Sequence, residues 1–559
     1  MKTMKKFLSM AALAMVGAMT VGCTSEDNVI DQAQTATKNN VVTQTVTVGF
    51  DEQAATRALA IDYTHKKLTK TFKAGDKIAV VYLNTSNKLV KVETTALTDD
   101  DITAEGKSAK FTVSMTNPKE NGTLKYIYPA AMAGATDVDY TKLASQDGTL
   151  ASLAANLDLA VFEGTLTAAS ELPASASLEN KLAILALTIK NSEGTEQLTG
   201  ITGMNIIAGT NSYSITGKDG DGHIYAAIQP TSGANISYFA TDGINNYTKA
   251  VTDKTYAANN IYNLGLKMTD ASVVSLEGRS EGEPITVSNG QTITGPLTDG
   301  EGYYTYATIT IEDGAIVTLK DVEINPGGDP SSGSGISGIT CEGNATIILE
   351  GTNTVNGFGR SGIEVKSGKT LTILGTGTLN ASGYNTFSGI GGEGNIVING
   401  GNITATGGEG AAGIGGGKNA SCGNIVINSG GTITATGGNK AAGIGSGFEG
   451  TCGNITISGG TINATGGSEG DQYGAGIGSG AHCSIDYTTS ITITSGVTSV
   501  TATRGGDGYE CKFIGAGSWC SGGATLTIDG VAVEDATTSS EFPNFTSVVS
   551  DNTWTLTHK

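Results

Sequence analysis

The front part of the chain alternates apolar and polar residues with the period of a β-strand. Val46, Val48 and Phe50 alternate with polar or small residues, which is the pattern of a strand with one buried face. Further strands are predicted at 78–82, 125–128, 182–189 and 224–228, and one short helix within 149–159. Pro129 and Pro230 close two of these strands, because proline cannot donate to a ladder. Short strands at regular intervals indicate β-sandwiches.

The back part of the chain consists of internal repeats. A Gly-Ile or Ile-Gly pair recurs with its isoleucine at Ile339, Ile363, Ile390, Ile414, Ile444, Ile477 and Ile514. Two further apolar series accompany it: Leu379, Ile403, Ile433, Ile462 and Val500, each two residues before an alanine, and Ile396, Ile425, Ile455 and Ile491. A repeat of three short strands cannot cover its own core, whereas stacked repeats can. We therefore expect a right-handed parallel β-helix of about seven coils, roughly 30–35 Å tall at ~4.8 Å per coil.

Two residue types mark the corners of this expected β-helix. Glycine fits corners that need a positive φ or a close backbone approach. The Gly-Asn pairs ending in Asn344, Asn395, Asn424 and Asn454 are expected to stack as an asparagine ladder, which is a structural device. The alternative is that this row of asparagines binds a glycan.

The cysteines indicate cross-links rather than a metal site. Cys422, Cys452 and Cys483 recur at similar spacings and would stack in adjacent coils, as a buried thiol ladder or with one bridge. Cys341, Cys511 and Cys520 lie outside this register. CxxC spacing is absent and His482 is the only nearby histidine, so we expect no metal and no cofactor.

The N-terminus has the pattern of a sorting signal. Lysines at positions 2, 5 and 6 precede an apolar stretch from Phe7 to Val21, which is shorter than a typical membrane span. Val21-Gly22-Cys23 resembles the lipobox of bacterial lipoproteins, which implies acylation of Cys23 and a lipid anchor. The following Thr-Ser-Glu-Asp resembles the acidic tag that directs some lipoproteins to the outer face of the outer membrane. Ordinary secretion with cleavage near Gly22 is the alternative.

The amino-acid composition argues against two classes of binding partner. The formal net charge is −20, from 53 acidic and 33 basic residues. An acidic chain without basic clusters is a poor binder of nucleic acid and of anionic lipid headgroups. No apolar run after the signal reaches transmembrane length.

Several pieces of the front part resemble, in order, the fimbrillin family of Gram-negative anaerobes. They lie at 72–78, 126–130, 146–150, 157–159, 180–189, 225–230 and 256–268. The resemblance implies two transthyretin-like β-sandwiches and a role in fimbriae or in surface proteins derived from them. The expected fold is thus all-β, with tandem fimbrillin-like sandwiches before the β-helix. We divide the chain into a signal peptide (1–22), a tether (23–40), two sandwiches (41–165 and 166–270), the β-helix repeats (271–530) and a C-terminal cap (531–559).

The same resemblance gives Arg57 a role. In polymerising fimbrillins a protease cuts after an arginine near this place, and a strand from another subunit replaces the removed first strand. A solvated arginine in a loop is the alternative. Shaft subunits end near the second sandwich, whereas this chain continues for about 290 residues. That continuation favours a terminal subunit or a stand-alone lipoprotein.

An enzymatic function has to be considered because many polysaccharide lyases and hydrolases are parallel β-helices. Hydrolysis needs two carboxylates flanking a bond, and lyases need calcium ligands and a base. Between residues 390 and 505 the acids are spread over different coils. We therefore expect no catalytic residues and no enzyme.

Four aromatic residues form the candidate glycan site. Phe358, Tyr384, Tyr473 and Tyr509 each lie just before a Gly-Ile turn, and aromatic faces suit sugar rings. The alternative is that these rings cover the edges of long turns.

The expected function is a surface-exposed, fimbria-associated adhesin that binds a polysaccharide or host glycan. The alternatives are a fimbrial subunit with the β-helix as spacer, an exported polysaccharide-active enzyme, and an ice-binding protein. The last rests on Thr-x-Thr pairs at 404/406, 434/436 and 501/503, a row that Asn463 interrupts. Threonine on an exposed β face explains these pairs without any ligand.

Overall fold

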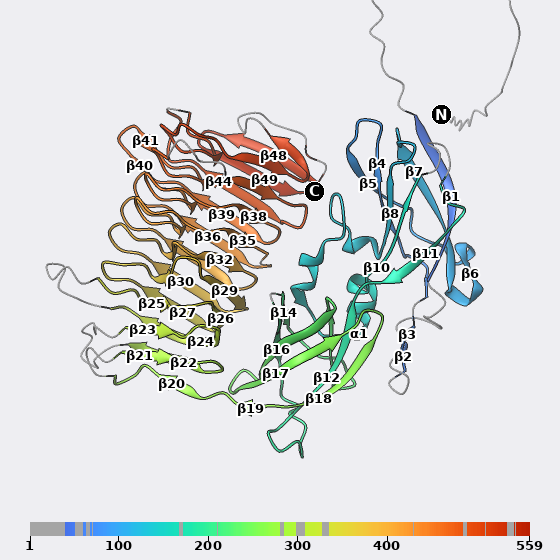
Figure 1. The fold of residues 1–559 in the computed structure, drawn as a ribbon, viewed down its shortest axis with the longest axis horizontal. Helices are drawn as coiled ribbons and strands as arrows, with labels where there is room; N and C mark the ends of the chain where they lie inside the picture. The colour runs from blue at the N-terminus through green and yellow to red at the C-terminus, as the bar shows by residue number, and fades with distance from the viewer. Residues whose placement is uncertain are drawn as a thin grey trace, which may run out of the picture. The chain divides into compact units, whose positions relative to one another are not determined.

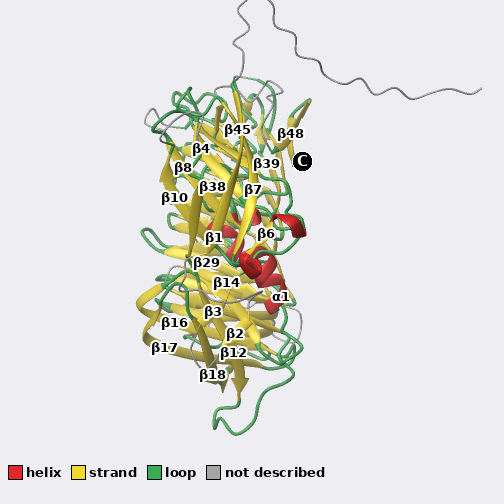
Figure 2. Ribbon diagram, turned by 90° about the vertical axis from the view of Figure 1, so that its right-hand side faces the viewer, coloured by secondary structure: helices red, strands yellow, loops and turns green. Residues whose placement is uncertain are grey.

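The computed structural model describes most of the chain. The described residues are 40–50, 60–62, 67–69, 71–166, 172–209, 211–279, 284–297, 308–326, 335–428, 430–483, 489–508, 510–533, 542 and 544–559. Cys23 and Arg57 lie outside them. Val41–Lys559 forms one compact unit, and strands dominate it while helix is confined to short pieces (Figure 2).

The first part of this unit is built on one eight-stranded sheet. Its order is β5-β4-β8-β10-β11-β1-β7-β6. The strands are β5 (Leu89–Glu93), β4 (Ala79–Leu83), β8 (Thr123–Tyr128), β10 (Ala160–Thr165), β11 (Ser175–Asn180), β1 (Val41–Phe50), β7 (Ser108–Thr116) and β6 (Ile102–Thr103). β1 lies inside the sheet, antiparallel to β7 and parallel to β11. Val46 and Val48 of β1 are buried with Phe72, Phe111 and Tyr126 in one core, as the alternating pattern predicts.

Two further sheets enclose a second core. A three-stranded sheet has the order β15 (Ile224–Ile228), β12 (Ala183–Lys190), β18 (Ile261–Lys267). A six-stranded sheet has the order β19 (Thr269–Asp270), β17 (Asn246–Tyr256), β16 (Thr231–Thr241), β13 (Gly203–Ala208), β14 (Asn211–Ile215), β9 (Ser145–Gln146). Ile184, Leu185 and Ile228 are fully buried between them. The helix expected within 149–159 is confirmed as α1 (Leu150–Ser152), which continues as a short π-helix over Leu153–Leu157.

The back part is a parallel β-helix with three strands per coil, stacked in chain order (Figure 1). The first series is β21 (Ile285–Val287), β23 (Ile309–Ile311), β25 (Ile339–Cys341), β28 (Ile363–Val365), β31 (Ile390–Gly392), β34 (Ile414–Gly415), β37 (Ile444–Gly445), β42 (Ile477–Gly478) and β45 (Ile514–Gly515). The second includes β24 (Ala315–Ile324), β26 (Ala345–Glu350), β29 (Thr370–Gly375), β32 (Asn395–Ile398), β35 (Ile425–Ile427), β38 (Ile455–Ile457), β43 (Ser490–Ile493) and β46 (Thr525–Ile528). The third is β27 (Thr352–Asn356), β30 (Thr378–Ser382), β33 (Asn402–Thr406), β36 (Thr432–Thr436), β39 (Thr461–Thr465) and β44 (Ser499–Thr503).

The predicted isoleucine register is confirmed. Ile414 pairs with Ile390 on one side and with Ile444 on the other, and all are fully buried. The number of coils is larger than the expected seven, because the first series has nine strands. The two additional coils begin at Ile285 and Ile309, which stack in the same register. Neither isoleucine has a neighbouring glycine, so the Gly-Ile pair does not reveal these coils.

The asparagine ladder is confirmed at one corner. The Asn395 side-chain oxygen accepts a hydrogen bond from the Asn424 backbone N–H, and the Asn424 oxygen accepts one from Asn454, both at 2.8 Å. The Asn344 side-chain oxygen likewise accepts from the Thr370 N–H of the next coil, and the Asn454 oxygen from the Ser490 N–H, both at 3.0 Å. These side chains satisfy backbone donors that the turns leave unpaired, so the row is structural.

The cysteines form two bridges. Cys422 is bonded to Cys452 and Cys483 to Cys520. The expectation that Cys520 lies outside the register is wrong, because a long coil of 37 residues separates it from Cys483 and brings it back to the same corner. Cys341 and Cys511 are free and buried, and burial raises the pKa of each thiol to about 12.

The last coil is closed by an antiparallel hairpin. β48 (Phe545–Ser550) and β49 (Thr553–His558) pair with each other, and β49 pairs with β44. Trp554 and Phe545 are buried in the β-helix core. The hairpin therefore covers apolar surface that another coil would cover elsewhere in the stack.

Candidate functional site

A groove of about 590 Å³ lies on the outer surface of the β-helix, beside strands β28, β31 and β34. Its position follows from the outward residues of these strands. Glu364 of β28 points outward between the buried Ile363 and Val365. The residues that stack next to it are Gly391 and then Gly415, which have no side chains. The glycines that line the groove itself are Gly392 and Gly417.

The glycine column cannot be filled by other residues. Gly391 has φ +140° and Gly415 has φ +130°, a backbone region that L-residues rarely adopt. A Cβ atom added at Gly391 would lie 2.1 Å from the carbonyl oxygen of Gly415. The column therefore requires glycine, because the backbones of adjacent coils approach closely there.

Charged side chains form the wall of the groove. The Glu364 carboxylate accepts hydrogen bonds from Lys366 Nζ at 2.8 Å and from Ser337 Oγ at 2.6 Å. It also lies 3.5 Å from Arg360 Nη1. Burial disfavours the charged form of Glu364, but these donors and cations outweigh burial and lower its pKa below the ordinary value. Glu364 thus holds both cations in fixed positions within the groove.

The groove also carries an aromatic ring that the sequence search missed. Phe387 lines the groove, and the Arg360 guanidinium lies 5.7 Å from the centre of its ring. Lys418 lines the groove from the next coil, where its backbone N–H donates to the Thr386 carbonyl at 2.9 Å. Phe387 lies three residues before Ile390, whereas the four predicted aromatic residues precede their isoleucines by four to six residues.

Two of the four predicted aromatic residues come together next to this groove. Phe358 and Tyr384 stack with ring centres 5.5 Å apart, and Tyr384 is 45% exposed. The Tyr384 N–H donates to the carbonyl of Arg360, and the Tyr384 carbonyl accepts from the N–H of Phe387. The stacked pair and the groove therefore share two adjacent turns, one from each of two neighbouring coils.

The other two predicted aromatic residues are not part of this cluster. Tyr473 belongs to the short strand β41 (Gln472–Tyr473), which pairs with β40 (Ser468–Glu469), and its ring covers Gly506 and Gly508. Tyr509 lies outside the described residues, as do the predicted lipidation site Cys23 and the predicted cleavage site Arg57. The structure thus leaves the processing and anchoring predictions untested.

A second aromatic column occupies the turns after β37, β42 and β45. The ring centre of Phe448 lies 5.6 Å from that of His482, which lies 6.1 Å from that of Trp519 in a stacked arrangement. Lys440 lies 4.9 Å from the Phe448 ring centre. Because these rings contact one another and a cation, they stabilise the stacked turns.

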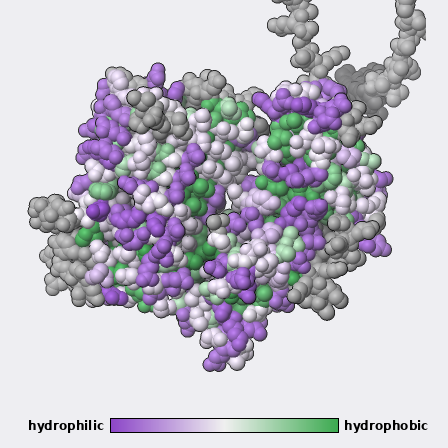
Figure 3. Space-filling model, viewed as in Figure 1, coloured by the Kyte–Doolittle hydropathy of each residue, from purple (hydrophilic) through white to green (hydrophobic). Residues whose placement is uncertain are grey.

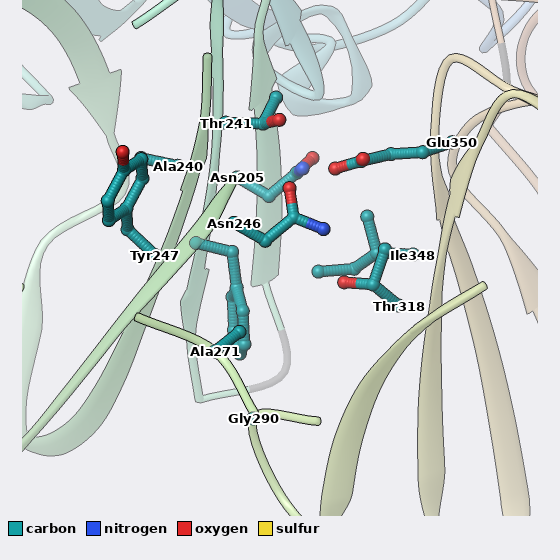
Figure 4. A pocket seen from close by; sticks show the side chains of 11 residues that line it. Asn205, Ala240, Thr241, Asn246, Tyr247, Ala271, Gly290, Thr318, Ile348 and Glu350 are labelled. Carbon is teal, nitrogen blue, oxygen red and sulfur yellow. The ribbon is translucent and has the colours of Figure 1, made fainter. Parts of the chain in front are cut away.

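One further pocket is too small for a ligand. The pocket in Figure 4, where Asn205, Asn246 and Glu350 converge, holds only about 10 Å³, room for about one water. Within the described ranges, no cluster of three metal-binding side chains occurs. No helix among the described residues has the length and apolar character to cross a membrane. Hydrophobic residues form only small separate patches on the face shown in Figure 3.

The groove can therefore bind a ligand that offers both hydrogen-bonding groups and apolar C–H surface. Arg360, Lys366 and Lys418 donate, Glu364 accepts, and Phe387 supplies an apolar ring. A volume of about 590 Å³ lies within the ~300–1,000 Å³ of small-molecule sites.

Comparisons with known proteins identify the repeats of the back part. A family model described as a β-helix repeat matches residues 396–418, 425–448 and 455–481. No curated protein sequence matches the chain.

Among solved structures, the chain is similar to a fimbrial assembly protein from Parabacteroides distasonis, with 10% identity, a TM-score of 0.23, and coverage of 41% of this chain and 90% of that one. It is similar to a candidate cell adhesion protein from Bacteroides fragilis, with 13% identity, a TM-score of 0.23, and coverage of 40% and 92%. A third such protein, from Bacteroides uniformis, has 13% identity, a TM-score of 0.24, and coverage of 40% and 96%.

These proteins are described as fimbrial and cell adhesion proteins, the kind of protein that the fimbrillin resemblance of the front part predicts. The family model independently identifies β-helix repeats in the back part. The identities and TM-scores are too low to carry any argument about what this chain binds. Its function therefore has to be argued from its own residues.

Proposed function

We propose that this protein is a fimbria-associated adhesin of the cell surface, and that the groove beside β28, β31 and β34 binds a glycan. The observation that carries the proposal is the groove itself, in which fixed charged groups and an aromatic ring line a cavity of about 590 Å³. Fimbrial and adhesion proteins also occur among the similar structures.

A sugar ring matches this lining. Its hydroxyl groups pair with charged side chains, and its C–H face packs on an aromatic ring. Arg360 and Lys366 are already positioned by Glu364, so little side-chain entropy is lost when a ligand binds. Tyr384 extends the apolar surface beyond the groove, since its ring is 45% exposed.

The proposed activity is binding without catalysis. Glycoside hydrolysis needs a carboxylic acid whose pKa is raised so that it can protonate the leaving group. The pKa of Glu364 is instead lowered, and its oxygens already accept hydrogen bonds from Lys366 and Ser337. Glu364 is thus suited to hold cations and not to donate a proton.

A glycan array tests this function directly. The mature chain should bind a defined set of oligosaccharides, and Tyr384→Ala should lower the affinity about tenfold or more while leaving the melting temperature unchanged. The matched control is Tyr140→Ala, which removes a tyrosine that is 38% exposed from the front part of the chain. Absence of binding to every glycan, or equal loss in both variants, would count against the proposed site.

We further propose that the protein is a lipoprotein anchored through Cys23 on the outer face of the outer membrane. The lipobox-like Val21-Gly22-Cys23 and the acidic residues after it support this location. Acylation at several positions gives stable anchoring where one chain would not. The β-helix would then be displayed to glycans outside the cell.

Assembly with other fimbrial subunits is proposed to use strand exchange after cleavage at Arg57. β1 supports this idea, because it lies between β7 and β11 and buries Val46 and Val48. Its removal would open a groove with unpaired backbone groups on both sides, which a strand of another subunit can fill. In the alternative function, a fimbrial subunit, the β-helix would be a spacer and would bind no glycan.

A further inference from the structure

One face of the β-helix is a continuous array of uncharged polar side chains. The face is formed by β27, β30, β33, β36, β39 and β44, which lie one above another (Figure 1), and by β49 of the closing hairpin. Each of the seven strands contributes three outward residues, which gives three columns. We name this surface the threonine face.

The three columns are uniform in chemistry. The first is Thr352, Thr378, Asn402, Thr432, Thr461, Ser499 and Thr557; the second is Thr354, Asn380, Thr404, Thr434, Asn463, Thr501 and Thr555; the third is Asn356, Ser382, Thr406, Thr436, Thr465, Thr503 and Thr553. Fifteen of these 21 residues are threonine, four are asparagine and two are serine. None is charged, none is apolar, and none is buried.

The columns are also regular in space. The strands pair without a bulge from β27 to β44, and Thr503 Oγ1 lies 3.1 Å from Thr553 Oγ1 where the hairpin joins. Neighbours are spaced ~4.8 Å across strands and ~6.7 Å along a strand. Asn463, which appeared to interrupt the threonine row, stands in register between Thr434 and Thr501 and continues the same hydrogen-bonding capacity.

The hydroxyl and amide groups of the middle column are available to a partner. Within the part of the chain that the structure describes, no side chain of this column makes a hydrogen bond. Each threonine also exposes a methyl group, so the face offers donors, acceptors and small apolar contacts in alternation.

Simple strand propensity does not account for this uniformity. Threonine suits an exposed strand, but the paired outward residues of β32 and β35 are Val397 and Val426. Edge and surface strands usually carry charges that prevent association. On a chain of net charge −20, a face without any charge favours a neutral partner.

We propose that the threonine face binds the ordered surface of a neutral, insoluble polysaccharide. Such a surface presents rows of hydroxyl groups and C–H groups at fixed spacing, which the three columns can meet together. The face covers roughly 400–500 Å², estimated from seven strands and three columns, which is less than the ~800 Å² per partner of a stable complex. Single contacts are therefore weak, and binding depends on many copies on one cell.

The mixed composition favours a polysaccharide over ice. Asn380, Asn463 and Ser382 preserve hydrogen bonding but change the size and shape of the lattice points. Binding to ice requires binding groups of uniform geometry. A sugar hydroxyl group can both donate and accept a hydrogen bond, so it can pair with threonine, serine or asparagine. This inference is independent of the glycan groove, which lies beside other strands of the β-helix.

Depletion from solution by solid polysaccharides tests the proposal. The full mature chain is mixed with microcrystalline cellulose and with granular starch, and the unbound protein is measured. Wild type should bind at least one solid. Thr404→Lys with Thr434→Lys places two charges at the centre of the middle column without touching the core, and should lower the apparent affinity at least tenfold.

Two matched variants make the result decisive. Thr456→Lys with Thr492→Lys adds the same charges to paired outward positions on β38 and β43 and should bind like wild type. Tyr140→Ala, which removes an exposed tyrosine of the front part, should also bind like wild type. No depletion of wild type by either solid would overturn the proposal, as would equal binding of the Thr404/Thr434 variant. Inhibition of ice recrystallisation that this variant abolishes, without binding to either solid, would assign the face to ice instead.

Discussion

The glycine column of the first strand series should tolerate no side chain, even a methyl group. Gly445 has φ +131°, and a Cβ atom added there would lie 1.8 Å from the carbonyl oxygen of Gly478 in the next coil. The neighbouring atom is backbone that is itself paired along the stack, so it cannot move alone. Gly445→Ala is therefore expected to disturb at least two coils.

The magnitude follows from two additive costs. A non-glycine residue in a sparsely populated backbone region costs about 1–3 kcal/mol, and overpacking in a rigid surrounding costs about 1–3 kcal/mol. The expected loss of local stability is about 4 kcal/mol. Since about 1.4 kcal/mol corresponds to a factor of ten, amide protection in these coils should fall about a thousandfold.

Native-state hydrogen exchange measures this loss where it occurs. The amides to follow are those of Ile444 and Ser446, which donate to carbonyls of Gly476 and Gly478 in the next coil. The matched control is Gly430→Ala in the same repeat, where an added Cβ meets nothing within 4 Å. Protection in Gly445→Ala within threefold of the control would refute the reasoning about the glycine column.

Three further predictions concern processing and the cysteines. Cys23→Ala should remove the protein from the detergent phase or leave an unprocessed precursor; partitioning like wild type would contradict the lipid anchor. An arginine-specific protease should cut folded protein after Arg57 and permit assembly, whereas Arg57→Gln should stay intact; resistance of wild type at Arg57 would argue against strand exchange. Because burial raises the thiol pKa of Cys341 and Cys511 to about 12, both stay protonated at pH 8. Neither should react with iodoacetamide in the native state, both should react after denaturation, and reduction should expose four more thiols; native labelling would contradict this burial.

The repeat architecture could be predicted from the sequence because the inward-facing residues repeat with a recognisable period. Ile414 and Ile444 stack as the spacing of the Gly-Ile pairs indicates, since a buried position accepts few residue types and keeps its period. The spacing of Gly-Ile pairs does not predict coils that lack such a pair, as at Ile285 and Ile309. The spacing also fails to predict the position of Cys520, because the coil between Cys483 and Cys520 is longer than the others.

The groove was much harder to predict than the fold. Its wall depends on Ser337, Glu364 and Arg360, and Ser337 belongs to a different coil from the other two. Which outward residues meet across coils depends on turn geometry, which varies from one repeat to the next. Only the proximity of Phe358 and Tyr384 followed from a common position in the repeat. Gly392 and Gly417 line the groove, but glycine recurs throughout the repeats and does not single this place out.

The central claim is that the groove beside β28, β31 and β34 is the glycan site. A crystal structure of the mature chain with the best oligosaccharide from the array tests it most directly. We predict a sugar in the groove, hydrogen-bonded to Arg360 or Lys418 and packed on the ring of Phe387 or Tyr384. An oligosaccharide bound only elsewhere, or an empty groove at a concentration that saturates binding in solution, would contradict the claim.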